Sequence, residues 1–372
     1  MLGGKMTHNR RGASTEVKNE NLEQQTMFDD LPSELLELIF SRLTLDNNIR
    51  ASVVCKRWHS VATSVRVLSY APWLMYRPLY GNQYEFYDPF HYKTYSIDLP
   101  ELSGSIICYA KDGWLLLYGS ETRQLFFFNP FTRDMIKLPG CDETTYLAAF
   151  SCAPTSSECV LFIVSYVSPS AVNISTCYPG AIEWTTVNYQ NQLPLSMSSM
   201  IWNKVVFCNG LFYCLSFEGL LAMFDTDERS WTVLSVPLPK CRNNCVRDLF
   251  NEELMFMTEQ EGNIIVITQC SSENPVVLKL DRTLMQWKVM RTLGGGTLFA
   301  GFMSSHSRIG LPRSMRNYVY FPVYGTEYKS TISFSLDDCS FYPHKNWFPP
   351  ELIFCFNDII WIEPPKDFSG FT

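Results

Sequence analysis

The residues of this chain that could perform chemistry are few and widely separated. The five histidines are His8, His59, His91, His306 and His344. The last three stand far apart and have neither a histidine four residues away nor a carboxylate at the spacing of a metal site. No Gly-x-Ser-x-Gly motif marks a nucleophile. The sequence therefore predicts no catalytic residue, no metal ligand and no cofactor.

The cysteines also argue against a metal or disulfide framework. The chain has 13 of them, an odd number, and several, such as Cys208 and Cys214, sit inside apolar runs. The closest pair, Cys241 and Cys245, lacks the C-x-x-C spacing of zinc ligands. The N-terminal residues lack the apolar core of a signal peptide, and no run of eighteen apolar residues suggests a membrane span. We expect reduced thiols in a protein of the cytoplasm, the nucleus or both.

Two further motifs and the net charge also give no indication of catalysis or of ligand binding. The run LGGGT at 293–297 lacks the Lys-Ser/Thr ending of a phosphate loop, which favours a turn between repeats. The aromatic run LFFFNPF at 125–131 has no interleaved Lys or Arg and is typical of strand core. The net charge of -7 gives no basic surface for nucleic acid.

The elements that follow from the pattern fall into three parts. Residues 1–27 are polar and aperiodic, which predicts a disordered tail, and residues 28 to about 64 have helical periodicity. From residue 71 onward, short apolar runs such as GWLLLYG, LFYCLSF and NIIVITQ alternate with Gly, Pro, Asn and Asp. Many short strands with regular turns predict a sandwich, a barrel or a propeller.

An internal repeat decides among these three folds. Asp225 precedes Trp231, and Asp281 precedes Trp287, with the same spacing inside two strand–turn–strand runs that are 56 residues apart. Asp88 and Asn129, 41 residues apart, belong to a second related pair of runs, and two more divergent copies lie at 174–187 and 331–343. A repeat of this length is typical of a β-propeller blade, so residues 71–365 predict about six blades. The last strand, in DIIWIEPP, is expected to pair near PWLMYR and to close the ring.

The helical part has more apolar residues than it can bury. In DDLPSELLELIFSRL the residues Leu31, Leu35, Ile39 and Leu43 recur every fourth position, with Leu36 and Phe40 beside them. The following run VCKRWHSVA adds a second apolar face. Three short helices of under about 40 residues cannot enclose all of these side chains. We predict Leu36, Val53 and Ala62 as internal residues and a partner for the remainder.

These two runs resemble an F-box over residues 28–66, with the Leu-Pro pair and the Val-Cys-Lys-x-Trp run at the separation usual in that family. The resemblance implies that the helices dock on a Skp1-type adaptor, which links to a cullin. The contact residues that it implies are Leu31, Pro32, Leu35, Ile39, Leu43, Val54, Cys55 and Trp58. The alternative is that these residues form the internal core of a helical cap on the propeller, and Trp58 can serve both purposes.

The remainder resembles the propeller half of plant F-box/kelch-repeat proteins of the KIB-like group, in runs such as LFFFNPFTRDMIKLP and VVFCNGLFYCL. Kelch repeats usually carry a Gly-Gly pair in every blade, whereas this chain has only GGG at 294–296. The resemblance implies that propeller loops bind a target protein, for which a GSK3-like kinase is one candidate.

Together these observations predict a mainly β protein with a small α N-terminal domain, a three-helix F-box followed by an about six-bladed propeller. We interpret it as the substrate-recognition subunit of an SCF-type (Skp1–cullin–F-box) ubiquitin ligase, without catalytic activity and with no nucleic-acid or membrane partner. The alternative is a propeller protein-binding module that acts without ubiquitin transfer. Adaptor affinity separates these two functions. An enzyme that uses the propeller channel is a third reading, which bound metal or a coloured cofactor would favour.

Overall fold

The computed structural model of the protein describes residues 31–40, 43, 50–65, 71–77, 80–140, 146–168, 170–192, 202–239, 254–269, 274–322, 332–343 and 359–364. The chain divides into two compact units, Met1–Leu68 and Ser69–Thr372. The predicted tail at 1–27 lies outside the described residues, as do His8, His344, Cys241 and Cys245.

The first unit contains the helices α2 (Ser33–Phe40) and α4 (Lys56–Val65). The carbonyl oxygen of Pro32 accepts the N–H groups of Leu35 and Leu36 at 3.1 and 3.2 Å, so α2 begins directly after the proline. Glu34 lies in the first turn, where the helix dipole favours a negative charge. Residues 50–52 are also helical, and the rest of the predicted second helix lies outside the described residues.

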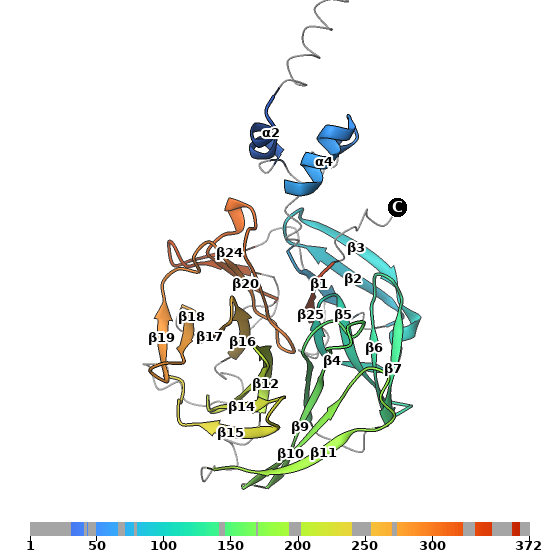
Figure 1. Ribbon diagram of the computed structural model, residues 1–372, viewed down its shortest axis with the longest axis vertical. Coiled ribbons are helices and arrows are strands. Elements are labelled where there is room, and N and C mark those ends of the chain that lie inside the picture. Colours follow the sequence, from blue (N-terminus) through green and yellow to red (C-terminus); the bar gives the residue numbers. More distant parts are fainter. Residues whose placement is uncertain are drawn as a thin grey trace, which may run out of the picture. The chain divides into compact units, whose positions relative to one another are not determined.

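The second unit is a six-bladed β-propeller, as the repeat predicted, and the strands of its described residues form six sheets (Figure 1). From the innermost strand outward, the first blade contains β25 (Ile359–Ile362), β1 (Trp73–Tyr76), β2 (Gln83–Asp88) and β3 (Lys93–Asp98). The second blade contains β4 (Ser105–Lys111), β5 (Trp114–Gly119), β6 (Gln124–Phe128) and β7 (Met135–Gly140). The third blade contains β8 (Tyr146–Phe150), β9 (Leu161–Ser168), β10 (Ala171–Cys177) and β11 (Thr185–Gln190). The fourth blade contains β12 (Trp202–Cys208), β13 (Leu211–Ser216), β14 (Leu221–Asp225) and β15 (Ser230–Leu234). The fifth blade contains β16 (Leu254–Gln260), β17 (Asn263–Gln269), β18 (Val276–Asp281) and β19 (Gln286–Met290). The sixth blade contains β21 (His306–Arg308), β20 (Thr297–Phe299), β22 (Tyr318–Phe321), β23 (Ile332–Ser335) and β24 (Ser340–Pro343).

The sixth blade departs from the four-stranded pattern. It has five strands, and β20 runs parallel to β22 while the short β21 lies innermost. Two 3₁₀ turns, η1 (Pro100–Leu102) and η3 (Arg313–Met315), interrupt the connections. The glycine run at 294–296 lies in the turn between β19 and β20, as predicted.

The repeated Asp or Asn builds the same turn in four blades. The Oδ1 atom of Asp225 accepts the N–H groups of Asp227 and Glu228, both at 2.9 Å. Asp281, Asp88 and Asn129 make the equivalent pairs of bonds in the outer hairpins of their blades. Because these side chains replace backbone partners in the turn, the hairpins keep one register along the chain.

Tryptophans on the outer strands link neighbouring blades. The indole Nε1 of Trp231 donates to Asn191 Oδ1 at 3.0 Å, and that of Trp287 donates to the carbonyl oxygen of Val236 at 3.1 Å. Each bond reaches the preceding blade. The aromatic residue of the repeat therefore packs between neighbouring sheets.

The last strand of the propeller pairs with the strand that the sequence predicted as its partner. β25 is antiparallel to β1, with Trp73 opposite Ile362 and Tyr76 opposite Ile359. Figure 1 shows the two strands side by side, although they come from opposite ends of the propeller sequence. All four side chains of β25 are buried. The first blade is therefore built from both ends of the unit.

Deletion of residues 356–372 is expected to make the protein insoluble. The deletion removes β25 and exposes the apolar edge of β1, which is a template for pairing with other chains. The soluble fraction after expression, compared with the full-length chain, measures this effect. A truncated protein that stays soluble and folded would refute the closure as the source of stability.

Candidate functional site

The helical unit has a small core made by two helices. The buried side chains are Leu36, Phe40, Val61 and Ala62, and Trp58 packs against them with its ring centroid 5.1 Å from that of Phe40. The guanidinium of Arg57 donates to the carbonyl oxygen of Leu31, which joins α4 to the segment before α2. Leu36 and Ala62 are internal, as predicted.

The residues predicted to contact an adaptor separate into two groups. Leu35 and Ile39 are 47 and 45% exposed on α2, and Pro32 and Val54 are also exposed. The half-buried members are Leu31, Leu43, Cys55 and Trp58, of which all but Cys55 pack against the core. The Sγ atom of Cys55 accepts the N–H of Trp58 at 3.4 Å and so orders the start of α4.

Two exposed apolar residues were missed or misplaced by sequence reasoning. Val53, predicted as internal, is 79% exposed in the turn before α4, so that prediction was wrong. Leu38 is exposed as well, and it lies three residues after Leu35 and one before Ile39. The i, i+3, i+4 spacing could have indicated that these three side chains share one face of the helix. An exposed apolar face of this kind fits a groove on a partner.

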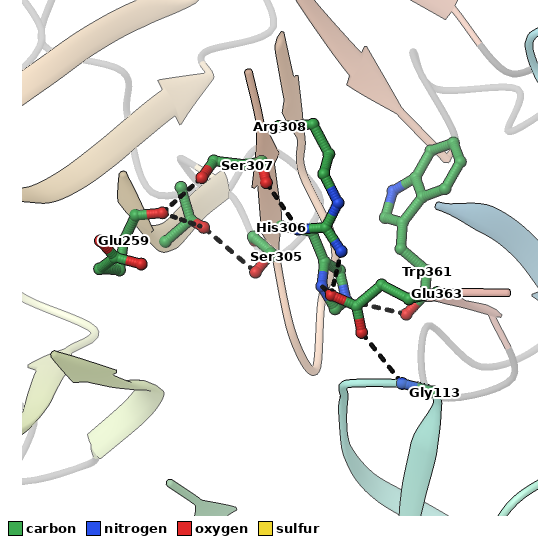
Figure 2. A network of polar contacts seen from close by, with 9 residues as sticks. Gly113, Glu259, Ser305, His306, Ser307, Arg308, Trp361 and Glu363 are labelled. Atoms are coloured by element: carbon green, nitrogen blue, oxygen red, sulfur yellow. Dashed lines mark hydrogen bonds and ion pairs between the residues drawn. The ribbon is translucent and has the colours of Figure 1, made fainter. Parts of the chain in front are cut away.

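In the propeller unit, a cluster of polar side chains lies where the ring closes (Figure 2). The Glu363 carboxylate accepts hydrogen bonds from the N–H of Gly113 at 3.1 Å, from His306 Nδ1 at 3.1 Å, and from Arg308. Glu363 directly follows β25, Gly113 lies between β4 and β5, and His306 and Arg308 are on β21. The carboxylate therefore holds the first, second and sixth blades together.

His306 lies between two oxygen atoms. Its Nδ1 faces the Glu363 carboxylate, and its Nε2 lies 3.0 Å from the carbonyl oxygen of Trp361. Burial alone would raise the pKa of the Glu363 carboxyl, but His306 and Arg308 outweigh burial and hold that pKa well below its ordinary value.

The same hairpin is tied to the fifth blade. Ser307 Oγ donates to the carbonyl oxygen of Glu259 at 2.6 Å, and Thr258 Oγ1 donates to that of Ser305 at 3.2 Å. No sequence spacing connects His306 with Glu363, so sequence reasoning set the histidine aside as isolated.

The depressed pKa of Glu363 predicts that the propeller loses stability in acid. In the unfolded chain this carboxyl takes up a proton near pH 4.5, whereas in the folded state it stays ionised to much lower pH. Its contribution is therefore fully present above about pH 4.5 and is lost as the pH falls below it. Urea unfolding from about pH 6 to about pH 3 should show the difference between wild type and Glu363→Gln shrinking with acidity. A constant difference would contradict this.

Comparison with known proteins identifies both units. The KIB1-4 β-propeller family model matches residues 86–350, and the F-box domain model matches residues 28–70. The chain belongs to the KIB1-4 β-propeller family. Its relatives are named as F-box proteins, and some of them as F-box/kelch-repeat proteins. F-box/kelch-repeat protein At1g57790 of Arabidopsis thaliana is 41% identical, covering 94% of this chain and 98% of the relative.

Two other relatives of this KIB1-4 β-propeller protein come from the same plant. F-box protein At4g00893 is 40% identical over 91% of this chain and 87% of its own length. F-box protein At3g56470 is 44% identical over 77% of this chain and 76% of its own length. The F-box and the propeller together support a role as a substrate receptor of SCF-type ligases in general, which joins a Skp1-type adaptor to a target.

Two observations on the described residues of this KIB1-4 β-propeller protein bear on other functions. No helix among them is long and apolar enough to cross a membrane. No three His, Cys, Asp or Glu side chains among them gather closely enough to hold a metal ion.

Proposed function

We propose that this protein is the non-catalytic substrate-recognition subunit of an SCF-type ubiquitin ligase of the cytoplasm or the nucleus. Its F-box docks on a Skp1-type adaptor, and its propeller loops bind the target protein. The observation that carries this proposal is the exposed apolar face of α2, formed by Leu35, Leu38 and Ile39. A free protein exposes such a face at a cost, which burial against an adaptor removes.

The receptor acts by proximity. It holds a target lysine close to the charged ubiquitin carrier, so a bimolecular encounter becomes a tethered reaction at raised local concentration. Loops carry the recognition of the target because the strands are committed to the fold. The family resemblance is the sole basis for naming a GSK3-like kinase as a candidate target.

The test is reconstitution of the full-length protein with a plant Skp1-type adaptor, a cullin and its RING subunit. We expect a stable complex on size-exclusion chromatography and ubiquitin transfer to a bound target, with a GSK3-like kinase as the first candidate. If the folded protein binds no Skp1-type adaptor, the receptor function is refuted. The propeller is then a binding module that acts without ubiquitin transfer.

A further inference from the structure

The innermost strand of the fourth blade is irregular. The pairing of β12 with β13 skips one residue between Trp202 and Lys204, and such a bulge re-aims the side chains around it. Trp202 and Val205 belong to the apolar cluster shared with the third blade, and Val206 to the cluster shared with the fifth. Asn203 and Lys204 belong to neither cluster and are half-buried. Both residues lie on β12, which contacts the innermost strands β8 and β16 of the two neighbouring blades and therefore lies next to the axis of the ring.

Lys204 lacks an anionic partner. Its ammonium donates to the carbonyl oxygen of Asn203 at 3.3 Å, and it makes no ion pair with a carboxylate of the described residues. Although part of the side chain is accessible, loss of hydration around the ammonium lowers the pKa of Lys204 to about 8. The Oδ1 atom of Asn203 is buried and has no hydrogen-bond partner among the described residues.

This arrangement lowers the stability of the protein, and no contact among the described residues compensates for it. Charged groups in protein interiors are normally paired, and buried amide oxygens normally accept a hydrogen bond. A donor and an acceptor at neighbouring positions of one strand both lack their usual partners. Such uncompensated groups concentrate where a ligand completes them.

We propose that Lys204 anchors an anionic group, a carboxylate or a phosphate, that enters the propeller along its axis. The ammonium is a compact positive charge that binds either group through charge-assisted hydrogen bonds. A hydroxyl or amide N–H next to the anionic group donates to Asn203 Oδ1. This anion site goes beyond the receptor role and does not depend on the adaptor.

The first test measures the cost of the unpaired charge. In the full-length protein, Lys204→Met is expected to raise the melting temperature by about 2 °C, because methionine keeps the apolar stem and removes the poorly hydrated charge. Lys279→Met is the matched control, since Lys279 is also a half-buried lysine on a strand. We expect no rise in this control.

The second test measures anion binding with inorganic phosphate and with glutarate, each against sodium chloride of equal ionic strength. At least one of the two anions is expected to raise the melting temperature of the wild type by about 3 °C. Lys204→Arg should keep this shift and Lys204→Met should lose it. A response to phosphate alone assigns a phosphate ligand, and a response to glutarate alone assigns a carboxylate.

Two results overturn the proposal. One is a Lys204→Met protein that melts below the wild type, which would make the lysine a stabilising residue. The other is the absence of any anion-induced shift that depends on Lys204. Neither result touches the F-box, so the adaptor-dependent function stands or falls separately.

Discussion

Replacing Leu35 and Ile39 together by alanine is expected to weaken binding of a Skp1-type adaptor by about 100-fold or more while the helices stay folded. Both side chains are nearly half exposed on α2, so their loss leaves the small core intact. Alanine also has the highest helix propensity, so α2 itself is retained. The measurement is the dissociation constant by titration calorimetry, with helical content checked by circular dichroism.

The matched control for this variant is Leu36→Ala. Leu36 is adjacent in sequence but only 1% exposed, so its truncation opens a cavity and costs about 2–5 kcal/mol of stability. It should lose helical signal together with binding. If the variant with Leu35 and Ile39 replaced by alanine also loses its helical signal, or if it binds the adaptor as tightly as the wild type, the exposed face of α2 is not the docking surface.

The choice of Leu35 and Ile39 depends on the structure. Leu31 and Pro32 are the more conspicuous pair in sequence. However, Leu31 packs against the core. Changing that pair would mix a loss of contact with a loss of folding.

Glu363→Gln is expected to destabilise the propeller by about 3–5 kcal/mol, because it leaves the half-buried Arg308 and the buried His306 without their carboxylate partner. In a unit of this size the melting temperature should fall by about 10 °C. The lost charge lies at the junction of three blades, so the closing strand β25 loses its anchor. Chemical unfolding followed by tryptophan fluorescence gives the free energy of unfolding.

The control for this variant is a solvent-exposed ion pair of the same chain. Lys288 lies 2.6 Å from Asp281, and the lysine side chain is 55% exposed. Lys288→Gln should lower the free energy of unfolding far less than Glu363→Gln does, because water screens the pair. Equal losses in the two variants would mean that the Glu363 cluster is not a special stabilising element of the closed ring.

Four strands, β4, β8, β20 and β21, were not predicted, although the innermost strands β12, β16 and β25 were. β8 contains the buried pair Ala148 and Ala149, and β20 and β21 have three residues each. Small or few residues weaken the β-branched and aromatic signal on which strand prediction depends.

The sequence by itself determined the elements whose signal is local. A side chain that bonds its own turn, as Asp225 and Asp281 do, repeats with each hairpin, so the blade length and the number of blades follow from spacing. The apolar ends of the propeller unit likewise predicted the pairing of β25 with β1. The two runs of the F-box were also local, because each lies within one short segment.

Only the tertiary structure decided which apolar residues face outward and which distant polar groups meet. Val53 was predicted as internal together with Leu36 and Ala62, yet it is 79% exposed, whereas the other two are buried where α2 packs against α4. His306 and Glu363 are 57 residues apart and meet because ring closure brings β21 beside the end of β25. Contacts of this kind depend on how segments pack across the ring, and no spacing along the chain encodes that packing.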